Sequence, residues 1–135
     1  MLRNPLYTAK ATRLISWAKE LERFCQAIEL AELTLTFVSS DEMRSHCQTI
    51  VHDADTLALP QRLIPAARAL GDAAYLLEEA LTGGVSNAEG TVVIDEEAYR
   101  RAHAYTLKAL EALRSPARRY GADMDQLETV GGLYL

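Results

Sequence analysis

The chain has only two cysteines in 135 residues, so it is not a disulfide-stapled scaffold. No apolar run approaches the roughly 18 to 20 residues needed to cross a bilayer, and we expect no membrane span. The first twenty residues lack the apolar core and small-residue cleavage site of a secretory signal peptide. We therefore expect a cytoplasmic protein in which Cys25 and Cys47 are reduced thiols.

Sequence motifs of the common catalytic and nucleotide-binding sites are also missing. The chain contains no GxxxxGK phosphate loop, no GxGxxG, no HExxH, no GxSxG and no CxxC. Adjacent acids such as Glu78-Glu79 and Glu96-Glu97 do not face each other on a helix, and no nucleophile, base and orienting group occur together. We expect no enzymatic activity, no catalytic residues and no cofactor.

A metal site is not expected either. The nearest arrangement of ligand types places His46 and Cys47 shortly before His52 and Asp53. Six residues of helix turn through about 600°, so the two histidines face directions about 120° apart. His46 and Asp53 share a face, but two ligands from one helix make a weak site. The cysteines fall on apolar stripes, which predicts buried, inert thiols.

What the chain does have is enough apolar material for one sizeable core. Apolar residues make up 49% and charged residues 24% of the 14.9 kDa chain, which is typical of one globular domain. We expect a single helical-bundle domain over residues 1–120, followed by a C-terminal tail over residues 121–135.

The first two helices are predicted by apolar residues at alternating spacings of four and three. The first begins at Asn4-Pro5, an N-cap followed by proline at the first helical position. Its stripe consists of Tyr7, Ala11, Leu14, Ala18, Leu21, Cys25 and Ile28. The second begins at Ser39, at capping-box spacing from Glu42, and ends before Pro60. Its core face consists of Met43, Cys47, Ile50, Ala54 and Leu57.

Two further helices follow. The third runs from near Pro65 to about Thr82, with a stripe of Ala66, Leu70, Ala73, Leu77 and Ala80. The glycine-rich loop 83–90 separates it from the fourth helix, which Asp95 caps and Ser115-Pro116 is predicted to end. The stripe of the fourth helix consists of Ala98, Ala102, Tyr105, Ala109 and Ala112.

Short connections between the helices favour an all-α fold, an up-and-down four-helix bundle. The second and fourth helices then start at the same end, and a short apolar extended segment precedes each of them. We expect these segments, 34–38 and 91–94, to pair as a small two-stranded ribbon at that end.

Charge is unevenly distributed along the chain, which carries −5 overall. Residues 1–24 carry +3, residues 25–99 carry −10, residues 100–119 carry +5 and residues 120–135 carry −3. Two interpretations stay open: the basic helices attract the acidic middle within the fold, or they form a basic strip that meets phosphate or an acidic partner. The candidate contacts with a protein partner or nucleic acid are Lys10, Arg13, Arg68, Arg100, Arg101, Lys108, Arg114, Arg118 and Arg119.

Arg68 is included because it lies within an alanine-rich helix. It either pairs with Asp72 at i,i+4 spacing or acts as a buried or partner-facing anchor.

Residues 34–114 resemble a known family in the order of their predicted helices and extended segments. Three stretches occur in sequence: LTFVSSDEMRSHCQTIVHDAD, PAARALGDAAYLLEEAL and TVVIDEEAYRRAHAYTLKALEAL. Together they resemble the helical region that follows the ATPase core in primase-helicase-like replication proteins of phages, plasmids and integrated elements. In that family a similar arginine occupies the place of Arg68, and an I-x-x-E-x-x-x-A pattern opens the last helix. In this chain the corresponding residues are Val93-Ile94-Asp95-Glu96-Glu97-Ala98, in which the spacing of the pattern is slightly shifted. The sequence also lacks the ATPase core of that family.

The resemblance implies an accessory module beside a DNA-replication motor of a mobile element, with no catalysis of its own. Two hypotheses follow for function. The first is a non-catalytic helical-bundle module that acts through protein–protein contacts, in a larger assembly or by self-association. The second is a nucleic-acid-associated accessory domain that uses the basic first and last helices, although the negative net charge disfavours it.

Overall fold

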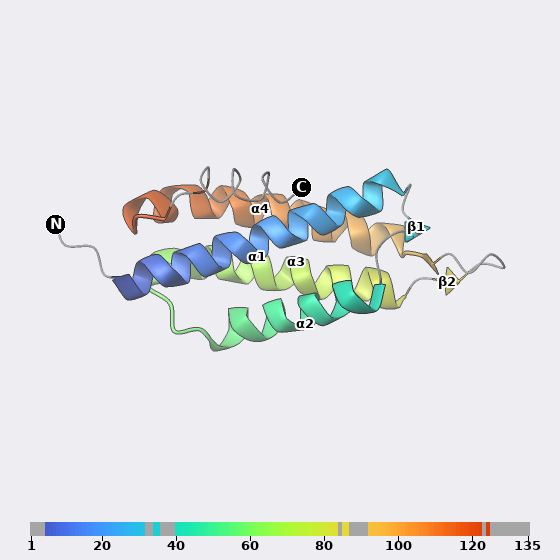
Figure 1. Cartoon of the computed structure of the whole chain (residues 1–135), viewed down its shortest axis with the longest axis horizontal. Helices are drawn as coiled ribbons and strands as arrows, with labels where there is room; N and C mark the ends of the chain where they lie inside the picture. The colour runs from blue at the N-terminus through green and yellow to red at the C-terminus, as the bar shows by residue number, and fades with distance from the viewer. Residues whose placement is uncertain are drawn as a thin grey trace.

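The computed structural model of the chain (Figure 1) describes residues 5–31, 34–35, 40–83, 85–86, 92–122 and 124. Helices make up most of this part of the chain. They are α1 (Pro5–Leu30), α2 (Ser40–Thr56), α3 (Ile64–Thr82) and α4 (Glu96–Arg119), with a 3₁₀ turn, η1 (Gln61–Leu63), just before α3. The predicted all-α class is confirmed.

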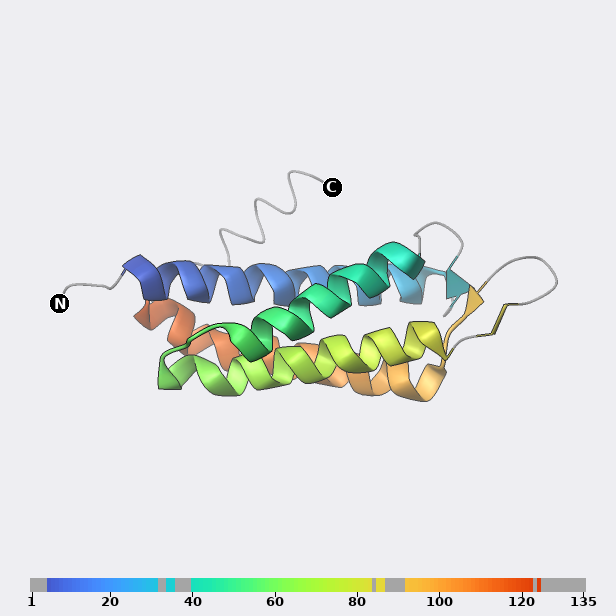
Figure 2. The same ribbon diagram turned by 90° about the horizontal axis from the view of Figure 1, so that it is seen from below.

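Successive helices run in opposite directions, as the colours in Figures 1 and 2 show. The end of α1 and the start of α2 lie at the same end of the molecule as the end of α3 and the start of α4. None of the described helices is both long enough and apolar enough to cross a bilayer.

The alanine-rich helix α3 has the widest buried surface, because it packs against both α2 and α4. All five residues predicted for its stripe are buried, and so are Ala67, Ala69, Ala74, Leu76 and Leu81. Small side chains let the neighbouring backbones approach closely. At Gly71 the fit is tight: a Cβ placed there would lie 3.3 Å from the Cβ of Ala54 on α2.

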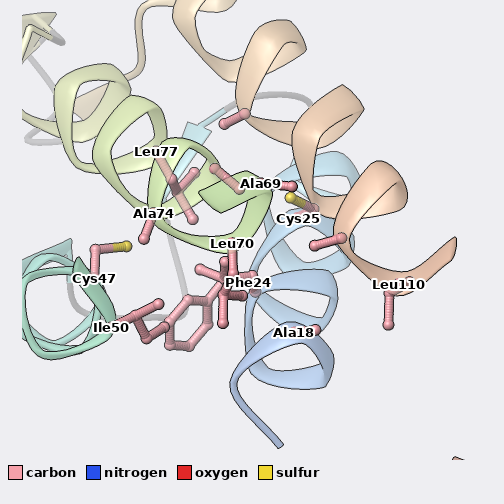
Figure 3. Packing of buried hydrophobic residues seen from close by; sticks show 14 of the residues in the cluster. Ala18, Phe24, Cys25, Cys47, Ile50, Ala69, Leu70, Ala74, Leu77 and Leu110 are labelled. Atoms are coloured by element: carbon pink, nitrogen blue, oxygen red, sulfur yellow. The ribbon is translucent and has the colours of Figure 1, made fainter. Parts of the chain in front are cut away.

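Helix α1 packs mainly on α4 and α3, whereas its direct contacts with α2 are sparse. Of its seven predicted stripe residues, all are buried except the half-buried Tyr7. Larger side chains fill the wider space between α1 and α2. Figure 3 shows the buried ring of Phe24 reaching from α1 toward Ile50 of α2.

Short extended segments meet at the end of the molecule where α2 and α4 begin. Strand β3 (Val92–Val93) pairs antiparallel with β1 (Thr34–Leu35) on one side and with β2 (Val85–Ser86) on the other. The predicted ribbon joined 34–38 to 91–94, but only two residues of each segment pair here. Residues 36–38 and 91 lie outside the described residues.

The predicted end of the fourth helix at Ser115-Pro116 is wrong, because α4 continues through Pro116 to Arg119. Proline removes one backbone donor, but tertiary packing favours the extra turn. Ala117 is buried, and the amide of Tyr120 donates to the carbonyl of Pro116 at 2.9 Å. The start agrees with expectation: the Asp95 side chain accepts a hydrogen bond from the amide of Ala98 at 3.2 Å.

The buried face of α4 also differs from its predicted stripe. Tyr105 and Ala112 are only half-buried. Five residues outside the predicted stripe are buried: Tyr99, Thr106, Leu110, Leu113 and Ala117. The buried face is therefore rotated toward the side of Tyr99, since α4 contacts both α3 and α1.

Several predicted features lie outside the described residues. They are the capping residues Asn4 and Ser39, most of the loop 83–90 and most of the tail 121–135.

Candidate functional site

The nine basic residues predicted as partner contacts fall into groups with different surroundings. Two of them, Lys10 and Arg13, lie on α1; Arg13 contacts α2, and Lys10 contacts the segment that follows α2. Arg13 donates through Nε to Oδ2 of Asp53 at 2.8 Å, and its Nη2 forms an ion pair with the same oxygen at 2.8 Å. Lys10 donates to the carbonyl of Ala58 and lies 6.0 Å from the centre of the Tyr7 ring. An ion pair between the basic first helix and the acidic middle of the chain is thus formed at Arg13, whereas Lys10 contacts a backbone carbonyl and an aromatic ring.

The geometry of α1 also prevents a continuous strip with α4. The side of α1 that faces α4 includes Glu29, which accepts a hydrogen bond from the hydroxyl of Tyr99 at 2.7 Å. At 100° per residue, Arg13 and Glu29 lie about 160° apart around the helix axis. Of the two interpretations left open by the sequence, a basic strip formed jointly by the first and last helices is therefore not assembled.

Arg68 is exposed on the outward side of α3. It is not a buried anchor, and within the described part of the chain it forms no ion pair with Asp72 or with any other residue. Tyr75, two turns along the same helix, is also 61% exposed. Arg68 thus stays a candidate contact for a partner.

The remaining six basic residues all lie exposed on α4. They are Arg100, Arg101, Lys108, Arg114, Arg118 and Arg119. We name the outward side of this helix the α4 basic face, consisting of these six residues with Ala104 and Leu107. Leu107 is half exposed, at 50%, and lies near the middle of the face.

The charges of the α4 basic face are only partly neutralised. Arg100 pairs with Glu96, and Nε of Arg114 lies 3.4 Å from a carboxylate oxygen of Glu111. Exposed pairs of this kind contribute little and exchange readily with other partners. In the part of the chain that the structure describes, Arg101, Arg118 and Arg119 form no hydrogen bond or ion pair. The face therefore presents positive charge around an exposed apolar side chain.

Both thiols are buried and unpaired with each other, as predicted. Burial is the main reason why the pKa of Cys25 rises from 9.0 to about 12. Burial likewise raises the pKa of Cys47 to about 12, with a smaller contribution from the negative charge of Glu78. Neither thiol forms a thiolate near neutral pH.

The side chains considered for a metal site point in different directions. His46 lies with Nδ1 3.2 Å from a carboxylate oxygen of Glu20 and with its ring against Phe24, while His52 is exposed. Asp53 faces α1, where it binds Arg13. Among the described residues, no group of three or more potential ligands lies close enough to hold a metal ion.

The sequence interpretation missed two residues of structural or functional importance. Asp53 is 7% exposed and accepts hydrogen bonds from Arg13 and from Nε1 of Trp17, the latter at 2.7 Å. The i,i+4 spacing of Arg13 and Trp17 could have indicated a shared acceptor, though not which one. Leu107 was also missed, although its position opposite the buried stripe of α4 predicted its exposure.

No family model matches the chain, and no significant match was found among curated proteins or solved structures.

Proposed function

We propose that this chain is a non-catalytic helical module that binds an acidic surface of another protein through the α4 basic face. The observation that supports this proposal is the composition of that face. Six exposed cations lie on the same side of α4 as the half-exposed Leu107, interspersed with the exposed acids Glu97 and Glu111, and three of the arginines have no partner among the described residues. Protein interfaces commonly combine an apolar centre, arginine and a charged rim.

A nucleic-acid interface is the second candidate, favoured by the same six cations. Phosphate binding gains from a field that is positive over a broad area. Two features weaken this candidate: the chain carries −5 overall, and Lys10 and Arg13 already have partners within the fold, the Ala58 carbonyl and Asp53. An apolar side chain in the middle of the face also suits a protein better than a phosphate backbone.

The biological setting remains the one that the resemblance implies. An accessory module of a nucleoprotein assembly, such as a replication complex of a mobile element, would meet its motor protein through a surface of this kind. A reducing compartment such as the cytoplasm is consistent with the two unpaired thiols.

The proposal is tested by affinity purification of the tagged chain from its native host, followed by mass spectrometry. The test variant combines Arg101→Gln, Leu107→Ser and Arg118→Gln. The matched control combines Ser45→Glu and Thr49→Glu on the exposed side of α2, which lowers the net charge by the same two units. We expect a partner that stays with the wild type and the control but falls at least tenfold with the test variant. Equal recovery with all three chains would refute a role of the α4 basic face.

A second arm separates the two candidates. The lysate is treated with nuclease, and binding of the purified chain to duplex DNA is measured by fluorescence anisotropy at 50 and 200 mM salt. Phosphate-driven binding weakens steeply over that range. Loss of the partner after nuclease treatment, together with salt-sensitive DNA binding, would favour the nucleic-acid function over the protein-binding one.

A further inference from the structure

We propose that a second copy of this chain docks on α4, with the two α4 helices antiparallel, along a stripe of six exposed residues. We name it the α4 stripe, and it consists of Glu97, Arg100, Ala104, Leu107, Glu111 and Arg114. The proposal goes beyond the proposed function, because the occupant is this chain itself and not a different protein.

The α4 stripe has the spacing of a contact between two helices. Its members recur at alternating intervals of three and four, as the contact positions of a coiled coil do. At 100° per residue they fall within about 100° of one another around the axis of α4. Leu107 is 50% exposed, and the side chains of Arg114 and Glu111 are 73% and 74% exposed. Since α4 packs on α1 and α3 with its buried face, the described part of the chain leaves this second regular stripe uncovered.

The apolar members of the stripe lie at its centre. In an antiparallel pair with a two-fold axis between Ala104 and Leu107, residues equally far before and after the axis lie opposite each other. Leu107 of each copy then packs against Ala104 of the other. The small side chain of Ala104 leaves room for Leu107, as a hole does for a knob.

The charged members are complementary in this arrangement. The same axis places Arg100 opposite Glu111 of the second copy, and Glu97 opposite Arg114. Symmetry repeats both contacts on the other side of the axis, so all four charged layers join opposite charges. A parallel pair would place each residue opposite its own copy, and all four layers would then join like charges. The charge pattern therefore favours a second copy in the antiparallel orientation.

The ion pairs already present on α4 extend this pattern. Arg100 pairs with Glu96, and Nε of Arg114 lies 3.4 Å from a carboxylate oxygen of Glu111. A guanidinium group has five donors and a carboxylate accepts several hydrogen bonds, so each side chain can keep its present partner and gain another. Charges then alternate from Glu96 and Arg100 of one copy to Glu111 and Arg114 of the other, and back to Glu97 of the first.

Three bases of the α4 basic face lie outside the stripe. Arg101, Lys108 and Arg119 are about 80° around the helix from its middle. They stay available to the acidic protein of the proposed function, and the dimer presents two copies of them.

The test is sedimentation equilibrium of the purified full chain. The stripe buries little apolar area, so we expect a weak dimer, whose average mass rises from 14.9 kDa toward twice that value between about 20 µM and 1 mM chain. Arg100→Glu should raise the dissociation constant at least tenfold, because two layers then join acids. Glu111→Arg should do the same, because two layers then join bases.

The matched control is Arg101→Glu, which changes the net charge as Arg100→Glu does but lies outside the stripe. It should leave the dissociation constant within about twofold of the wild type.

An equimolar mixture of Arg100→Glu and Glu111→Arg chains supplies the second measurement. In a mixed dimer both altered layers again join opposite charges, so the mixture should associate at concentrations at which each variant alone stays monomeric. Recovery also shows that both variants are folded. The proposal is overturned by a wild type that stays at 14.9 kDa at the highest concentration, by an Arg100→Glu chain that dimerises like the wild type, or by a mixture that stays monomeric.

Failure of this proposal is distinguishable from failure of the proposed function, because the dimer is measured with the purified chain alone. A wild-type chain that stays monomeric, yet loses its partner with the test variant of the affinity purification, overturns only the dimer. A chain that dimerises as expected, yet gives equal partner recovery with all three chains, overturns only the proposed function.

Discussion

Asp53 of α2 and Arg13 of α1, forty residues apart in sequence, are joined by an ion pair with a nitrogen–oxygen distance of 2.8 Å. The carboxylate side chain of this pair is 10% exposed and the guanidinium side chain 52%. Because the backbones of α1 and α2 make few close contacts, this pair and the neighbouring bond from Trp17, together with the contacts of His46 with Glu20 and Phe24, join α2 to α1.

Replacement of Asp53 by alanine should therefore lower the free energy of unfolding. The change removes the acceptor that Trp17 Nε1 and the Arg13 guanidinium share, and a hydrogen bond to a charged group contributes about 1.5–3 kcal/mol. Urea denaturation followed by circular dichroism measures the loss. The control is Asp55→Ala, an exposed acid on the same helix, which should change stability by less than about 0.5 kcal/mol. Equal stability of the two variants would contradict this assignment.

Replacement of Tyr99 by phenylalanine should also destabilise the fold, but less. The Tyr99 hydroxyl lies 2.7 Å from a Glu29 carboxylate oxygen and 3.2 Å from the Cys25 carbonyl oxygen, joining α4 to α1. Its removal should cost about 1 kcal/mol, a typical net value for such a bond. The matched control is Tyr105→Phe on the same helix, whose hydroxyl forms no hydrogen bond among the described residues. A thermal or urea melt in which both variants behave alike would rule the bond out as a stabilising contact.

The buried thiols should make stability fall at high pH. Burial raises the pKa of Cys25 and of Cys47 to about 12 in the folded chain, whereas an unfolded thiol ionises near 9.0. The unfolded state therefore releases protons that the folded state keeps. The stabilisation is fully present below pH 9 and is lost as the pH rises toward 12.

The corresponding measurement compares the wild type with the Cys25→Ala/Cys47→Ala variant between pH 9 and 11. The wild type should lose stability faster, by up to about 1.4 kcal/mol per pH unit for each thiol. If the stability of the wild type and of the variant changed with pH in the same way, the thiols would have the same pKa in the folded and unfolded chain. A thiol reagent at pH 8 should label the folded chain slowly and the chain in guanidinium rapidly.

Replacement of Pro116 by alanine should stabilise the chain, because Pro116 lies inside the last turns of α4. Alanine restores a backbone donor for the carbonyl of Ala112 and is the better helix former, so we expect a gain of about 1 kcal/mol or more. Ser115→Ala, an exposed change one residue earlier, tests whether helix propensity alone produces the gain. If Pro116→Ala lowers the urea midpoint, the proline ring contributes more packing than its backbone costs.

Much of the fold follows from local pattern. Every residue predicted for the stripes of α1 and α3 is buried except Tyr7, because the 3.6-residue period of a helix is a property of the segment itself. The further buried residues of α3 depend on its packing between two helices. The end of α4 was not predicted correctly, because the extra turn beyond Pro116 depends on the burial of Ala117 and on the contacts of Tyr120 with α1. The rotation of its buried face toward Tyr99 has a similar origin, since two neighbouring helices share it.

The sequence by itself determined the helical class, the apolar stripes of α1 and α3 and the burial of the two thiols. Only the tertiary structure decided which basic residues are available to a partner. Lys10 and Arg13 look the same as Arg101 and Arg118 along the chain. The first two have partners across the fold, the Ala58 carbonyl and Asp53, whereas the last two have none among the described residues. The physical reason is that helix periodicity shows which residues share a face of one helix. The charges that meet between two helices depend on how those helices pack.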